Sequence, residues 1–173
     1  MIRGLRLSAA AALLFGALAV RADEDKKPPE MPFEDGAFVK TAARSGMLET
    51  GLSKVAAKAA QRAEVKAFAE TVVADHAKMK EELKKAAAAA GIVLPEMMGE
   101  ENQKTLDRFA KYTGKDFDRD YAAEMIARHE KDVALFTTAT KAAKHPAVKD
   151  FAKKTLPTIQ AHLEAAGKLR PKD

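Results

Sequence analysis

Three of the chain's four histidines lie on the apolar faces of three different predicted helices, and a glutamate lies on the apolar face of a fourth. These residues are His76, His129, His162 and Glu49. Imidazole nitrogens and carboxylate oxygens are ligands of transition metals, and a bundle core holds a metal by aiming such groups inward from its helices. Four unrelated polar residues that only hydrogen-bond within a core would give the same pattern. A metal site requires the four groups to lie at the same level along the bundle, so their positions along the helices help to decide between these interpretations.

The positions of the four groups along their helices favour a common level. Each group lies between 13 and 16 residues past the start of its helix, and the predicted starts are Asp35, Ala63, Asp116 and Pro146. At about 1.5 Å per residue, all four lie roughly 20–24 Å along their helices. In an up-down-up-down bundle, mid-height residues share a layer whichever way each helix points. The sequence therefore predicts a mononuclear site for zinc, copper, manganese or iron, formed by Glu49, His76, His129 and His162.

Two further polar residues lie near this predicted layer. Asp132, one turn after His129 on the same face, is a candidate ligand or a hydrogen-bond acceptor for a ligand, and Tyr121 is a candidate donor. A ferritin-type di-iron centre is disfavoured, because it needs Glu-x-x-His on two helices. The residues three before the four histidines are Val73, Ile126, Ala142 and Ile159, none of them acidic. The fourth histidine, His145, precedes Pro146 at a helix junction, so we expect it to be a cap or a surface residue.

Four long helices and one short helix are expected to position these groups. Apolar residues recur with the 3.6-residue helical period from about 35, over 63–90, over 116–143 and from 146 to about 169, with a shorter helical segment over 100–112. Asp35 is a good N-cap for the first helix. Gly91 followed by Ile92 is typical of a Schellman ending for the second, with Pro95 as the stop. We therefore predict an all-α fold, an up-and-down four-helix bundle with an additional short helix between long helices 2 and 3.

The amino-terminal residues are predicted to be a secretory signal peptide. Arg3 and Arg6 form a basic start, Leu7 to Val20 is an apolar run, and Val20-Arg21-Ala22 is a small-x-small cleavage site. The run is too short to span a bilayer, and no other segment approaches about 18 unbroken apolar residues, so we expect no transmembrane helix. The predicted segments are a signal peptide over 1–22, a flexible tether over 23–33 and one bundle domain over 34–170. Cleavage near Ala22 would give a periplasmic or secreted protein.

Composition excludes several classes of function. The chain has 30 basic and 25 acidic residues, but the predicted signal peptide holds three arginines and no acid, which leaves a net charge of +2 after cleavage. We therefore infer no nucleic-acid partner. The chain has no cysteine, so disulfides, a thiolate nucleophile and covalent c-type haem are excluded. No Gly-x-Ser-x-Gly elbow, phosphate-binding glycine loop or acid/base pair with a substrate pocket can be named, so an enzyme is the least favoured class.

The motifs resemble a family of exported bacterial proteins called domain of unknown function 4142, whose members carry a predicted outer membrane protein label. The resemblance rests on Gly46-Met47-Leu48-Glu49, Glu64-Val65-Lys66-Ala67-Phe68-Ala69, Asp75-His76, Phe117-Asp118-Arg119 with Tyr121, His129 with Leu135-Phe136, and Thr155-Leu156-Pro157-Thr158 with His162. It implies a ferritin-like helical bundle in the periplasm or envelope, and no activity. The family tends to show Asp-His on both the second and the third long helix. Here Asp75 precedes His76, where it would orient or neutralise the site, but Arg128 precedes His129.

Two hypotheses about function follow. In the first, the chain is a periplasmic four-helix bundle that binds one transition metal through Glu49 and the three histidines, with Asp75, Tyr121 and Asp132 behind them, for metal handling or stress protection. In the second, it is a structural or interaction module with an envelope partner, and its inward histidines only hydrogen-bond within the core. Convergence of the three imidazoles to metal-bridging reach would favour the first.

Overall fold

The computed structural model describes residues 33–112, 114 and 116–170. Contacts divide the chain into two units, Met1–Met31 and Pro32–Asp173, and all the described residues belong to the second. The predicted signal peptide and the predicted tether up to residue 32 lie outside the described residues. Phe33, the last residue of that tether, packs against Phe38 with ring centroids 5.9 Å apart.

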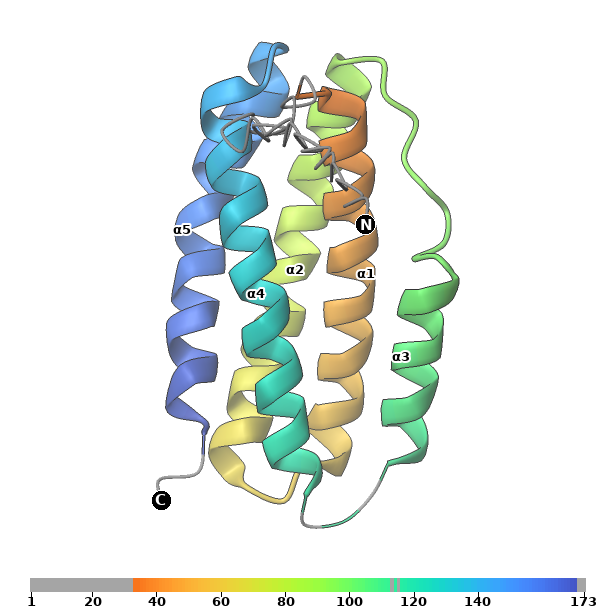
Figure 1. Ribbon diagram of the computed structural model, residues 1–173, viewed down its shortest axis with the longest axis vertical. Helices are drawn as coiled ribbons and strands as arrows, with labels where there is room; N and C mark the ends of the chain where they lie inside the picture. The colour runs from red at the N-terminus through yellow and green to blue at the C-terminus, as the bar shows by residue number, and fades with distance from the viewer. Residues whose placement is uncertain (1–32, 113, 115, 171–173) are drawn as a thin grey trace, which may run out of the picture. The chain divides into compact units, whose positions relative to one another are not determined.

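The described residues form five α-helices and no strand. The helices are α1 (Asp35–Ala59), α2 (Ala63–Ala89), α3 (Glu100–Lys111), α4 (Phe117–Ala142) and α5 (Pro146–Lys168). The four long helices make up a bundle in which α1 packs against α2 and α4, and α5 packs against α2 and α4 (Figure 1). Neighbouring long helices run in opposite directions (Figure 1). The predicted all-α bundle with a short helix between its second and third long helices is confirmed. The up-down-up-down order expected from the sequence is not observed, because α4 runs in the same direction as α2 (Figure 1).

The short helix α3 determines the direction of α4. With 27 residues, α2 is about 40 Å long, so the chain leaves it at the far end of the bundle. The connection after α2 and then α3 carry the chain back along the outside of α1 (Figure 1). As a result α4 starts at the same end as α2 and lies antiparallel to α1. This arrangement places the middles of all four long helices at one level.

Helix ends agree with the sequence in two places and differ in one. At the end of α2, the Ile92 amide donates to the Ala87 carbonyl at 2.9 Å, and Gly91 has φ 66°, which is the predicted Schellman ending. The His145 imidazole caps α5 by accepting from the Ala147 amide, as expected of a cap. The prediction that Asp35 caps α1 is wrong, because Glu34 is the N-cap. The Asp35 carboxylate instead accepts from the backbone amide of His145, in the connection between α4 and α5.

The apolar core consists of two clusters separated by a polar layer. One cluster surrounds Leu52, Phe68 and Tyr121, and the other surrounds Phe38 and Phe136. The buried polar side chains between them are Glu49, His76, His129, Asp132 and His162. Dense packing on both sides fixes the four helices relative to one another. The side chains of the polar layer therefore have little freedom to separate.

A buried carboxylate holds the turn between α1 and α2 against the start of α4. Asp118 is 5 % exposed and accepts from the backbone amides of Gln61 and Arg62 at 3.0 and 2.7 Å. These two amides lie just before α2, where the helix itself offers no acceptor. One side chain therefore satisfies both groups and fixes the turn to a third helix.

Replacing Asp118 with alanine is expected to lower the free energy of unfolding by about 2–3 kcal/mol, because two backbone amides lose a charged acceptor. Urea unfolding followed by circular dichroism measures the change. Asp107→Ala, on the exposed face of α3, is the matched control and should stay within about 0.5 kcal/mol of the parent. An Asp118→Ala protein as stable as this control would contradict the role given to the carboxylate.

Candidate metal centre

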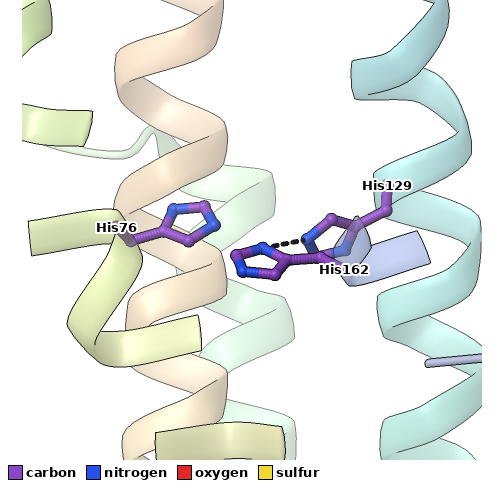
Figure 2. Close-up of side chains that lie close together, drawn as sticks. All are labelled: His76, His129 and His162. Atoms are coloured by element: carbon purple, nitrogen blue, oxygen red, sulfur yellow. Dashed lines mark hydrogen bonds between the residues drawn. The ribbon is translucent and has the colours of Figure 1, made fainter. Parts of the chain in front are cut away.

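The three inward histidines converge in the middle of the bundle. His76 comes from α2, His129 from α4 and His162 from α5, and each is buried. One ring nitrogen of each lies within 4.8 Å of the corresponding nitrogens of the other two, and the rings face one another (Figure 2). Three buried imidazoles at this separation are close enough to hold one metal ion.

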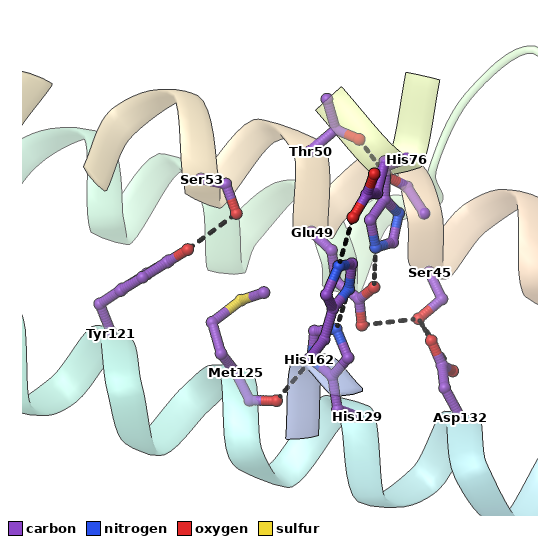
Figure 3. A network of polar contacts seen from close by, with 12 residues as sticks. Ser45, Glu49, Thr50, Ser53, His76, Tyr121, Met125, His129, Asp132 and His162 are labelled. Atoms are coloured by element: carbon purple, nitrogen blue, oxygen red, sulfur yellow. Dashed lines mark hydrogen bonds and ion pairs between the residues drawn. The ribbon is translucent and has the colours of Figure 1, made fainter. Parts of the chain in front are cut away.

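The second ring nitrogen of His129 determines its tautomer. Nδ1 lies 2.9 Å from the backbone carbonyl of Met125, one turn earlier in α4 (Figure 3). A carbonyl oxygen can only accept a hydrogen bond, so Nδ1 carries the proton. In the neutral ring Nε2 then keeps its lone pair, and this lone pair faces the other histidines.

His162 is held in the same way by a carboxylate. Its Nε2 lies 3.1 Å from Oδ2 of Asp75 on α2. Burial tends to raise the pKa of Asp75, but hydrogen bonds from Lys78 and His162 outweigh this and lower the pKa below its usual value. Asp75 is therefore ionised and accepts the Nε2 proton, so in the neutral ring of His162 the lone pair is on Nδ1. A metal-binding histidine typically has such a carboxylate behind it.

These two tautomers point their lone pairs at each other. Nε2 of His129 and Nδ1 of His162 are 3.3 Å apart (Figure 2). Two facing lone pairs repel unless a proton or a metal cation lies between them. In a tetrahedral site with metal–nitrogen bonds of about 2.0–2.1 Å, neighbouring nitrogens lie about 3.3 Å apart. The separation therefore fits two ligands of one ion.

His76 extends the group toward Glu49. Nε2 of His76 lies 3.3 Å from Oε2 of Glu49, within ion-pair distance but not aligned for a hydrogen bond. Both atoms are buried, and neither has a hydrogen-bond partner among the described residues. A buried polar atom left in this state costs about 1–3 kcal/mol. A cation coordinated by these two atoms would remove that cost.

Burial holds the imidazoles of His76 and His129 in the neutral form that metals require. Burial, with the neighbouring His129 and His162, lowers the pKa of His76 to about 3. Burial lowers the pKa of His129 to about 4, although its bond to the Met125 carbonyl acts in the opposite direction. Both rings are therefore neutral at physiological pH.

Two carboxyl groups lie at the edge of the histidine group and share one serine. The Ser45 hydroxyl lies 3.3 Å from Oε1 of Glu49 and 3.1 Å from Oδ2 of Asp132 (Figure 3). Burial and the neighbouring Asp132 raise the pKa of Glu49 well above its usual value, and burial raises the pKa of Asp132 to about 6. The nearby Arg128 opposes both shifts. A metal cation beside Glu49 would favour its ionised form more strongly.

The structure thus brings together Glu49, Asp75, His76, His129 and His162. Asp132 reaches this group through Ser45. The Tyr121 hydroxyl lies elsewhere, at 2.8 Å from Ser53 (Figure 3). Arg128 forms an ion pair with Glu124 at 2.7 Å and does not displace His129.

The sequence did not identify two residues that contribute to the site, Ser45 and Met125. Ser45 is one turn before Glu49 on the apolar face, which is a usable signal, whereas a carbonyl such as that of Met125 leaves none.

The solved structure found similar to this chain shares its fold. It is a crystal structure of a DUF305 fragment from Deinococcus radiodurans, at a TM-score of 0.67 and 15% identity, and the match covers 80% of this chain and 98% of that chain. At this identity the likeness is evidence for the fold alone. No curated protein matches the chain.

A family model provides the relationship that the motifs suggested. The model described as Domain of unknown function (DUF4142) matches residues 20–169, which include every helix of the bundle and the whole histidine group. The resemblance drawn from the motifs is therefore confirmed, and the chain belongs to the DUF4142 family.

Proposed function

We propose that this protein is an exported helical bundle that holds one transition-metal ion in its core and serves metal handling or stress protection. The observation that carries the proposal is the pair of facing lone pairs on His129 and His162, 3.3 Å apart. The Met125 carbonyl and the Asp75 carboxylate impose both tautomers from outside the pair. A cation between the two nitrogens removes their repulsion and satisfies both rings.

The proposed ligands are Nε2 of His129, Nδ1 of His162 and Nε2 of His76, with Glu49 beside His76 as the fourth donor. Three imidazoles and a carboxylate suit zinc, copper or iron better than a hard cation such as magnesium. Manganese, which favours oxygen ligands, fits this set less well. A bound ion would polarise a ligand in its coordination sphere, while the protein orients the imidazoles and excludes water from the layer.

A route to the proposed site lies beside His162. Asp75 and His162 line a cavity of about 650 Å³ between α2 and α5. The Asp75 side chain is 28% exposed, so its carboxylate contacts both the cavity and the imidazole. An incoming cation would therefore meet a negative group before it reaches the histidines.

The proposed location rests on the amino-terminal sequence, with its basic start, apolar run and small-x-small site. None of the described helices is long and apolar enough to cross a membrane.

The competing function is a module without a metal, in which a proton lies between His129 and His162. The two proposals differ in what binds between the two nitrogens, and this can be measured.

Untagged protein is expected to bind one zinc ion, and His129→Ala is expected to weaken binding by at least about 100-fold, because a ligand is lost. Asp75→Asn should weaken it by about 10–100-fold, because the His162 tautomer is no longer fixed. Isothermal titration calorimetry and elemental analysis measure affinity and stoichiometry. His145→Ala is the matched control, since the fourth histidine only caps α5, and it should bind like the parent.

Protein that takes up no zinc, copper or iron, and whose thermal stability is the same with and without added metal, would overturn the proposal. Equal loss of binding in His145→Ala and His129→Ala would also overturn it, because binding would then not depend specifically on the buried histidine layer.

In metal-free protein, the advantage of the parent over His129→Gln is expected to shrink by about 2 kcal/mol between pH 7.5 and pH 5. The pKa of His129 is lowered from 6.5 to about 4 in the folded protein, so the stability it contributes is present above pH 6.5 and is lost as pH falls toward 4. Glutamine does not titrate, so the difference isolates His129. Urea unfolding in EDTA at both pH values measures it. An advantage that grows toward pH 5 would indicate a proton shared between His129 and His162.

A further inference from the structure

His76 differs from the other two histidines in what lies behind it. His129 donates from its second ring nitrogen to a carbonyl, and His162 donates to a carboxylate. Nε2 of His76 faces Glu49, and no group of the described residues hydrogen-bonds to its Nδ1. The described residues therefore supply no acceptor at His76 of the kind that completes the other two rings.

Nδ1 of His76 faces a gap left by a glycine. A Cβ built on Gly46 would lie 3.4 Å from Nδ1 and within 4 Å of no other heavy atom. Gly46 lies inside α1, where glycine costs up to about 1 kcal/mol relative to alanine. The missing side chain leaves an opening between α1 and α2 that ends at this nitrogen.

This opening is the inner end of a large cleft. The cleft has a volume of about 1250 Å³, and α1, α2, the connection after α2 and the start of α3 line it. Gly46, Thr50 and His76 belong to its lining. Pockets for small organic ligands measure roughly 300–1,000 Å³, so a ligand of that class fits.

The cleft is lined by a group of apolar side chains as well as by charged ones. The apolar lining residues include Met47 beside Gly46 and, beyond His76, Met79, Leu83, Leu94 and Phe151, with Lys80 and Lys84 on the same stretch of α2. Leu83 lies about 10 Å along α2 from His76. Apolar side chains therefore extend from Gly46 far enough along α2 to contact an extended hydrocarbon chain.

Charged side chains also line the cleft, and two lysines lie close to Gly46 and His76 in the sequence. Four lysines and three acidic residues line the cleft, and Lys84 and Lys104 are in ion pairs with neighbours on their own helices. Lys80 is one turn after His76 on α2, and Lys54 is one turn after Thr50 on α1. Lys54 and Lys80 are therefore the cationic side chains placed to attract an anionic group that accepts from Nδ1, although Glu96 and Asp107 also line the cleft.

We infer that this cleft binds an amphipathic carboxylate of the fatty-acid class. Its carboxylate occupies the space above Gly46 and accepts the Nδ1 proton of His76, and its chain lies along Met47, Met79 and Leu83. The carboxylate then supplies His76 with the acceptor that Asp75 supplies to His162. This inference stands on the cleft and the glycine, and its link to metal affinity rests on the proposed function.

The coupling between carboxylate binding in the cleft and metal binding has an expected size and direction. An acceptor behind a metal-binding histidine typically changes metal affinity by about 10–100-fold. Occupation of the cleft should therefore tighten metal binding. By thermodynamic reciprocity, the metal should tighten binding of the carboxylate by the same factor.

Titration calorimetry of the full chain with decanoate tests the inference. Decanoate is expected to bind once per chain, and decyltrimethylammonium, of the same chain length and opposite charge, is expected to bind at least about tenfold more weakly. Gly46→Ala should weaken decanoate binding at least about tenfold, because its methyl group occupies the space in front of Nδ1. Gly167→Ala is the matched control, because a Cβ at this glycine in α5 meets nothing within 4 Å. It should bind decanoate like the parent.

Failure of decanoate to bind, equal binding of the two probes, or unchanged binding in Gly46→Ala would each overturn the inference. Circular dichroism of Gly46→Ala shows whether it folds, and its expected gain in helix propensity favours folding. Zinc titration of the same samples separates the two proposals. Zinc binding without decanoate binding overturns only the cleft inference, and the reverse overturns only the proposed metal site. If both ligands bind without affecting each other's affinity, the proposed hydrogen bond between Nδ1 of His76 and the ligand carboxylate is ruled out.

Discussion

Two nitrogen lone pairs held 3.3 Å apart, on His129 and His162, are the constraint on which the centre of this bundle depends. Neither ring can reverse its tautomer cheaply, because a carbonyl behind one and a carboxylate behind the other accept protons and cannot donate them. Helices α4 and α5 cannot move apart to separate the two rings, because apolar clusters pack the bundle on both sides of the layer. A repulsion that packing and hydrogen bonding both enforce can be relieved only by a positive charge between the rings.

Two buried groups of the same layer support the proposal of a metal ion rather than a proton. Burial lowers the pKa of His129 to about 4, so that ring resists a proton at neutral pH. Burial raises the pKa of Glu49, so that carboxyl resists ionisation. A metal cation accepts electron pairs from neutral imidazoles and stabilises a neighbouring carboxylate. It would therefore bind the neutral His129 ring and favour the ionised form of Glu49. Since it would bind only the folded arrangement, it would also stabilise the fold.

The sequence predicted the fold and the level of the site better than the contacts within the site. Helical periodicity and glycine signals placed five helices to within a few residues, because these signals are local. Counting residues from the start of each helix placed His76, His129 and His162 in one layer, because the rise of about 1.5 Å per residue is the same in every α-helix. The contacts depend on how each helix rotates about its axis, which no local pattern specifies. Asp75 therefore bonds across the bundle to His162 rather than serving the adjacent His76, and Asp35 meets His145 instead of capping α1.

The three histidines are not equivalent, and the fold explains the difference. His129 and His162 lie on α4 and α5, and the protein supplies an acceptor for each of them. His76 lies on α2 beside α1, where the chain leaves the bundle to form α3 and returns along the outside of α1. That detour creates the cleft, and Gly46 opens it to Nδ1 of His76, for which the described residues supply no hydrogen-bond acceptor. The topology that aligns the four long helices at one level therefore also leaves His76 accessible through the cleft.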